Sequence, residues 1–223
     1  YAVEKGAKIV DINFGCPARM ICGRACGSAL MADEDRAIAI LEAVRNAVGI
    51  PLTVKMRTGW DSAHKNALTL ARAAQSIGYA AVTIHGRTRE DRFRGVAEYE
   101  TIKAVAKALT IPVIANGDID GAQKAKTILT TSRAAAVMIG RAAEGAPWIF
   151  REMCGALDGK TVNRLTLKEK LQIIETHIKE HFTYWGETES AFKTFRKHLL
   201  WYLKEFPEGA DAARNCFDVT NTA

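Results

Sequence analysis

The chain has 223 residues, of which 48% are hydrophobic and 25% charged, enough apolar material for one sizeable core or for a domain with a smaller companion. Its net charge of +6 favours a polyanionic partner. No apolar run approaches the ~20 residues of a membrane span, and no signal-peptide pattern opens the sequence. We therefore expect a cytoplasmic protein without a membrane partner.

Alternating strand and helix patterns fill the first two thirds of the chain. Five apolar segments predict short buried strands, and each ends in polar or glycine-rich residues. They span residues 8–13, 52–57, 81–85, 112–116 and 135–139. Amphipathic segments between them predict helices, of which the first has Asp33 as its N-cap and the second ends at Gly78. Because the strands lack polar alternation, we expect them to be buried on both faces of a parallel sheet.

Two α/β architectures fit this alternation, an open doubly wound sheet and a (β/α) barrel. Chemically active residues at the ends of successive strands favour the barrel, in which every strand end faces one mouth. A (β/α)8 TIM barrel needs eight strands, so the sequence predicts only the last five βα units. We accordingly expect the chain to be a fragment of a larger enzyme.

The last part of the chain predicts helices alone. Thr166 and Glu169 have the spacing of a capping box, and a second helix is predicted over residues 190–205. On a helical wheel one face of this second helix is apolar and the other is basic. The apolar face contains Phe192, Phe195, Leu199 and Leu203, and the basic face contains Lys193, Arg196, Lys197 and Lys204. We therefore predict a barrel domain over residues 1–160 and a helical domain over residues 161–223.

Cys16 stands directly after the first predicted strand, at the edge where α/β enzymes place reactive groups. A buried cysteine of this kind is equally often a small hydrophobic core residue. The odd number of cysteines predicts free thiols, namely Cys16, Cys22, Cys26, Cys154 and Cys216. The first three lack the C-x-x-C spacing of common metal sites and have no histidine near them, so we expect no metal.

Cationic and glycine-rich residues follow the later strands. Lys55 and Arg57 point to the same side of one strand, and His85 ends the next strand. Two cations in an apolar strand are costly unless they meet an anion or a polar ligand, and a cofactor explains them economically. The last two strand ends, which include Gly117 and Gly140, suit a phosphate because glycines let backbone amides approach an oxyanion.

Six motifs together resemble one family, the bacterial tRNA-dihydrouridine synthases, and most of all their B type. In order they are NFGCP at residues 13–17, GSALM at 27–31, VKMRTGW at 54–60, IHGRT at 84–88, IANGD at 114–118 and MIGR at 138–141. The resemblance spans nearly the whole chain, including the helical part. It implies an FMN-dependent TIM barrel with a C-terminal tRNA-binding domain, which uses NADPH to reduce selected uridines of tRNA to 5,6-dihydrouridine.

The resemblance also implies roles for single residues. Cys16 would protonate C5 of the uracil after the flavin delivers a hydride to C6, and thiols are mostly protonated at neutral pH. Asn13 and Arg57 would hydrogen-bond the target uracil. The residues that would bind FMN are Lys55, His85, Asn116, Gly117, Asp118, Gly140 and Arg141.

Basic residues outside these motifs suit the RNA backbone. With the resemblance in view, we interpret the basic helical face and the arginine-rich loop after His85 as phosphate contacts. The loop contains Arg87, Arg89, Arg92 and Arg94. Two alternatives stay open, a non-catalytic RNA-binding fragment and an FMN barrel that reduces a free small molecule.

Overall fold

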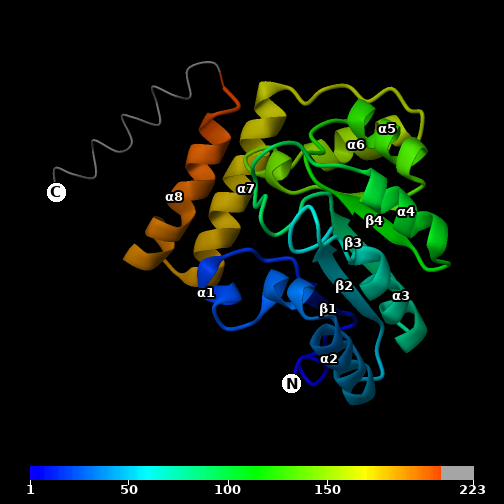
Figure 1. Cartoon of the computed structure of the whole chain (residues 1–223). Coiled ribbons are helices and arrows are strands. Elements are labelled where there is room, and N and C mark those ends of the chain that lie inside the picture. Colours follow the sequence, from blue (N-terminus) through cyan, green and yellow to red (C-terminus); the bar gives the residue numbers. More distant parts are fainter. Residues whose placement is uncertain (207–223) are drawn as a thin grey trace. The chain divides into compact units, whose positions relative to one another are not determined.

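A computed structural model describes residues 1–206 and divides the chain into two compact units, residues 1–139 and 140–223. The first unit contains a five-stranded parallel sheet in the order β1-β2-β3-β4-β5 (Figure 1). The strands are β1 (Val10–Phe14), β2 (Leu52–Arg57), β3 (Ala81–His85), β4 (Val113–Asn116) and β5 (Ala136–Met138). The five strands, their parallel pairing and the α/β class confirm the sequence-based prediction.

The helices of the first unit connect successive strands. They are α1 (Arg19–Cys22), α2 (Glu34–Ala47), α3 (Ala67–Ile77), α4 (Glu100–Ala108) and α5 (Ala122–Ser132), with the 3-10 turn η1 (Gly27–Ala32) before α2. Because parallel crossovers are right-handed, a consecutive strand order places all crossover helices on one face of the sheet. A doubly wound sheet would reverse its order and use both faces, so this topology is that of a (β/α) barrel.

The two faces of the sheet differ sharply in chemistry. Side chains of Val54, Met56, Val82, Ile84 and Ala115 point to one face and are fully buried. The opposite face, here called the polar face, takes every second residue of the strands. Its polar members are Asp11, Asn13, Thr53, Lys55, Arg57, Thr83, His85 and Asn116.

Burial on both faces, as predicted for all strands, holds for the middle of the sheet but is wrong for its edges. Asp11 and Asn13 of β1 are exposed, and so is Ala136 of β5. In the described part of the chain β1 and β5 each pair with a single neighbour, which leaves their side chains less covered.

Helix ends follow the local signals of the sequence. The Asp33 carboxylate accepts a hydrogen bond from the Arg36 N–H (3.0 Å), as an N-cap should. Gly78 ends α3 in the left-handed conformation with φ +95°. Thr166 and Glu169 form the predicted capping box, with the Glu169 carboxylate 2.8 Å from the Thr166 nitrogen.

The second unit is helical within its described residues. It begins with the turn η2 (Arg141–Ala143) and contains α6 (Ile149–Leu157), α7 (Leu167–Trp185) and α8 (Glu189–Leu203). Trp148, Leu165, Ile174 and Tyr202 are at the centre of its core. Among the described residues, none of the helices has the length and apolar character needed to cross a membrane.

The apolar face of α8 that the sequence predicts is only partly buried. Phe195 is buried, but Phe192 is 58% exposed, while Ala191 and Tyr202 are buried instead. The reason is the position of α7, whose His177 and His181 rings pack against Phe195 with centroids 5.1 and 5.0 Å away. The wheel gives the period of α8, whereas the neighbouring helix decides which stripe is covered.

Candidate functional site

The segment after β1 holds Cys16 at the carboxyl edge of the sheet, where the sequence predicts it. The Asn13 Oδ1 atom accepts hydrogen bonds from the backbone N–H groups of Gly15 (2.9 Å) and Cys16 (3.0 Å). The Cys16 carbonyl oxygen accepts from the Ser28 nitrogen (3.0 Å) and hydroxyl (2.9 Å). Cys16 itself is partly exposed. The backbone therefore fixes the position of the thiol without burying it.

Asn13 has a second consequence for the site. Because two backbone N–H groups bind Oδ1, the orientation of the amide is determined and Nδ2 is its donor end. Nδ2 has no hydrogen-bond partner among residues 1–206. Asn13 thus orients the Cys16 loop and still offers one donor.

Arg57 is a buried clamp between two loops. It donates from Nε to the Gly15 carbonyl oxygen and from Nη1 to the carbonyl oxygens of Thr88 and Arg92, each at 2.8 Å. Burial, followed by the charge of Arg87, lowers the pKa of Arg57 to about 10, so it stays cationic at neutral pH. Of the three guanidinium nitrogens of Arg57, only Nη2 lacks a hydrogen-bond acceptor among residues 1–206.

Lys55 is a half-buried cation without a direct partner. It lies on the polar face between Asn13 of β1 and Thr83 of β3, and no described residue forms a hydrogen bond or ion pair with its ammonium group. Burial lowers the pKa of Lys55, the charge of Arg57 lowers it further, and Asp11 raises it in part. A cation in this position favours an electron-rich or anionic ligand.

His85 is neutral in this environment. It pairs with Arg57 in the sheet register and is buried. Burial, followed by the charges of Arg57, Lys55 and Arg87, lowers the pKa of His85 to about 3. Its Nε2 atom lies 3.3 Å from Nη1 of Arg87. Since arginine is only a donor, Nε2 must accept, so the ring proton is on Nδ1 and His85 offers a neutral N–H group.

Arg87 and Asp118 form an ion pair that the sequence analysis missed. The carboxylate of Asp118 accepts two hydrogen bonds from Arg87, at 2.8 and 2.6 Å, and a third from the Ala97 nitrogen at 2.9 Å. Complementary charges directly after two adjacent strands are the signal that could have indicated this pair. The interpretation of Arg87 as an RNA contact is therefore wrong, because its side chain is 2% exposed.

The other arginines of this loop differ in exposure. Arg89 is half-buried and stacks over the Trp60 ring with its guanidinium carbon 4.3 Å from the centroid. Arg92 and Arg94 are exposed, and the Arg94 guanidinium donates to the Glu90 carbonyl oxygen at 3.2 Å. Of the four predicted contacts, Arg92 and Arg94 are the exposed ones.

The predicted phosphate residues belong to both units. Asn116 is buried and donates from Nδ2 to the Met138 carbonyl oxygen (2.9 Å), which ties β4 to β5. Gly117 and Asp118 follow it with φ +127° and +48°. Gly140 and Arg141 are exposed at the start of η2 in the second unit.

Four of the five cysteines lie among the described residues. Cys16, Cys22, Cys26 and Cys154 are free, as predicted, and Cys216 lies outside the described residues. Residues 1–206 contain no group of three or more His, Cys, Asp or Glu side chains arranged to hold a metal ion.

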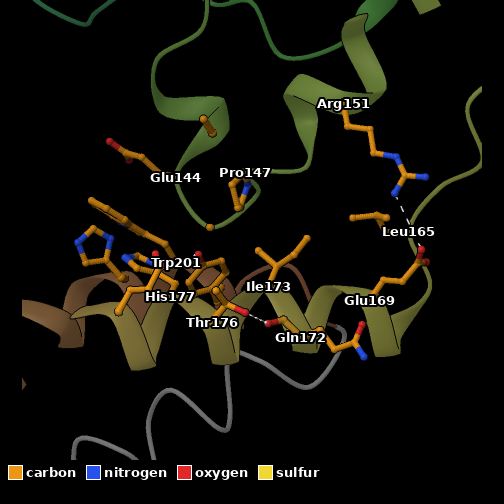
Figure 2. A pocket seen from close by; sticks show the side chains of 15 residues that line it. Glu144, Pro147, Arg151, Leu165, Glu169, Gln172, Ile173, Thr176, His177 and Trp201 are labelled. Atoms are coloured by element: carbon orange, nitrogen blue, oxygen red, sulfur yellow. Dashed lines mark hydrogen bonds and ion pairs between the residues drawn. The ribbon is translucent and has the colours of Figure 1, made fainter. Parts of the chain in front are cut away.

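A separate cavity of about 760 Å³ lies within the second unit, and the sequence analysis did not predict it. Figure 2 shows Glu144 and Pro147 on one side, facing Ile173 and His177 of α7. Trp201 and Tyr202 of α8 also line it. None of the sequence-predicted site residues belongs to its lining, so we place the candidate site on the polar face.

Comparisons with known proteins identify the family of the chain. The family model described as "Dihydrouridine synthase (Dus)" matches residues 1–223. The chain is 47% identical over 212 residues to a protein of Xanthomonas campestris pv. campestris named tRNA-dihydrouridine synthase B, and covers 95% of itself and 64% of that protein. A Pseudomonas aeruginosa protein of the same name is 47% identical over 206 residues, with coverage of 92% and 62%. The chain therefore spans less than two thirds of the length of these relatives.

Proposed function

The chain belongs to the dihydrouridine synthase family, and we propose that it carries the cysteine, flavin and RNA sites of an enzyme that reduces uridines of tRNA to 5,6-dihydrouridine. In this proposal residues 1–160 serve the reaction and residues 161–223 bind tRNA. The observation that carries it is Lys55, a half-buried cation on the polar face for which no described residue provides a direct partner.

The residues of the polar face fit an FMN group. Lys55 offers an unpaired ammonium group and His85 a neutral Nδ1–H donor, which together suit the electron-rich atoms of an isoalloxazine ring. We assign the phosphate to Asn116, Gly117, Asp118, Gly140 and Arg141. Because the Asp118 carboxylate already binds Arg87 and Ala97, its contribution would come from the backbone.

The chain's own residues account for the remaining steps. When bound, FMN would supply the hydride for C6 of the uracil, and NADPH would return the electrons to the flavin. The Cys16 thiol donates a proton to C5 and regains one from solvent. Asn13 Nδ2 and Arg57 Nη2 are the unused donors beside this loop, and we assign them to the uracil carbonyl oxygens.

The uridine must leave the base stack to reach the polar face, as for other enzymes that act on a base. We assign the exposed Arg92 and Arg94, together with the basic face of α8, to the phosphate backbone. These contacts would position the tRNA without reading its bases.

The test uses the complete protein that carries this chain, with flavin content measured by absorbance and dihydrouridine by nucleoside mass spectrometry. Cys16→Ala should keep its FMN and lose dihydrouridine formation by about 10²–10⁴-fold, the usual contribution of a general acid. Cys154→Ala, which changes an exposed thiol of α6, serves as the control.

Each contrary outcome identifies an alternative. Unchanged product from Cys16→Ala would remove Cys16 from the reaction. Reduction of free uridine without tRNA would favour an FMN enzyme with a small-molecule substrate. Salt-dependent tRNA binding by a protein that contains no flavin would favour a non-catalytic RNA-binding role.

A further inference from the structure

Two further cysteines, Cys22 and Cys26, lie in the segment after the predicted proton donor Cys16, and the side chain of Cys22 points toward the Cys16 backbone. The Cys22 Sγ atom lies 3.6 Å from the Cys16 carbonyl oxygen and 3.5 Å from the Ser28 hydroxyl oxygen. The Ser28 hydroxyl donates a hydrogen bond to the same carbonyl oxygen. The Cys26 Sγ atom instead lies 3.3 Å from the Arg24 carbonyl oxygen. The Cys22 thiol is thus directed at the backbone of Cys16, whereas the Cys26 thiol is directed at the backbone of its own loop.

A buried cation lies beside both of these thiols. The guanidinium of Arg57 bonds the Gly15 carbonyl oxygen next to Cys16, and both Cys16 and Cys22 are close enough to raise the pKa of Arg57. The thiolate is the form of cysteine that reacts with oxidants. The Arg57 cation interacts electrostatically with both sulfurs and can pair with either one once it has lost its proton.

The segment that carries Cys22 can move at small cost. α1 has only four residues and none of them is buried, so a shift of this turn disturbs no core packing. Cys16 and Cys22 are six residues apart in sequence. A modest movement of α1 can therefore bring the sulfurs to bonding distance, which a disulfide requires.

We propose that Cys16 and Cys22 form a reversible oxidation site. A hydroperoxide oxidises the Cys16 thiolate to sulfenic acid, and the peroxide is reduced to water or an alcohol. The Cys22 thiolate attacks the sulfenic sulfur, hydroxide leaves and takes up a proton as water, and a Cys16–Cys22 disulfide forms. A dithiol reductant restores both thiols. If Cys16 is the proton donor, a consequence that rests on the proposed function, oxidation stops the reaction reversibly.

The sequence permits an unambiguous test by peptide mapping. Trypsin cleaves after Lys8, Arg19, Arg24 and Arg36, which places the three cysteines in separate peptides, residues 9–19, 20–24 and 25–36. The reduced complete protein is treated with a small excess of hydrogen peroxide, alkylated and digested without reductant. We expect a linked peptide of residues 9–19 and 20–24, two hydrogen atoms lighter than the sum, which dithiothreitol separates.

Two single variants control the assignment. Cys22→Ser should abolish the link and let Cys16 proceed to sulfinic acid, which dithiothreitol does not reverse. Cys26→Ser should form the same link as the unaltered protein. A link between residues 20–24 and 25–36, or oxidation of Cys16 to sulfinic acid at equal rates with and without Cys22, would overturn the proposal.

The failure of this proposal is distinguishable from failure of the proposed function. A Cys16–Cys22 link that leaves dihydrouridine formation unchanged supports the oxidation site and contradicts the role of Cys16 as proton donor. Loss of product in Cys16→Ala without any peroxide-induced link supports the proton donor and overturns the oxidation site.

Discussion

Arg87 and Asp118 are joined by a two-point ion pair, with Nη1–Oδ1 at 2.8 Å and Nη2–Oδ2 at 2.6 Å. The pair connects the segment after β3 to the segment after β4. Arg87 also donates to the carbonyl oxygens of Arg94 and Gly95, so one buried guanidinium fixes the loop that passes over the polar face. The exposed arginines of this loop owe their position to a buried one.

Asp118→Ala should lower the free energy of unfolding by about 3–5 kcal/mol, because it leaves the Arg87 charge buried without its partner. Urea denaturation of the complete chain measures this change. Asp158→Ala removes the exposed ion pair with Lys160 and should cost less than about 1 kcal/mol. Equal losses of unfolding free energy in the two variants would show that the buried pair contributes no more to stability than the exposed one.

The neutral state of His85 makes stability depend on pH. Its pKa of about 3 in the folded chain lies below the ordinary value near 6.5, so the unfolded chain binds the proton more readily. The contribution of neutral His85 to the free energy of unfolding is complete above pH 6.5 and is lost as pH falls toward 3. At pH 5 the free energy of unfolding should be lower by about 2 kcal/mol. Denaturation at pH 7.5 and 5 should therefore show a smaller pH effect in His85→Gln than in the unaltered chain. An identical pH effect in both proteins would contradict this assignment.

The sequence predicted the sheet well because its signals are local. Strands β2 and β3 have the predicted bounds, and Lys55, Arg57 and His85 share a face because side chains alternate along strands. The parallel register places the strand ends at one edge without further information. These facts follow from the alternation of side chains along each strand and from the polar or glycine-rich residues that end it.

Partners could not be predicted in the same way. The Arg87–Asp118 pair joins residues 31 positions apart and depends on the register of β3 with β4. Asn13 and Arg57 match motif residues, but which of their atoms are already bonded depends on the folded Gly15 loop. Exposure of Phe192 likewise depends on where α7 lies, which the periodicity of α8 does not contain.

Gly27 is required for the position of Cys16. Its φ is +59°, and a Cβ atom there would lie 2.8 Å from the Cys16 carbonyl oxygen. Gly6 has φ +89° with open space around it, so Gly6→Ala isolates the cost of backbone conformation, about 1–2 kcal/mol. Gly27→Ala should destabilise the chain further and also change the rate at which iodoacetamide alkylates Cys16. Equal destabilisation with an unchanged alkylation rate would show that the loop accommodates a side chain.

Lys55→Met separates ligand binding from stability. Without a flavin the ammonium group is half-buried and has no direct partner among the described residues, so replacing it by an apolar side chain should leave stability unchanged or raise it. FMN affinity should fall by about 10–100-fold, since a hydrogen bond to a charged group contributes roughly 1.5–3 kcal/mol. Flavin fluorescence titration and urea denaturation of the flavin-free protein measure the two effects. Lys107→Met, which changes an exposed lysine of α4, should alter neither. A Lys55→Met protein that binds FMN normally but unfolds more easily would assign Lys55 a structural role and would remove the main support for the flavin site.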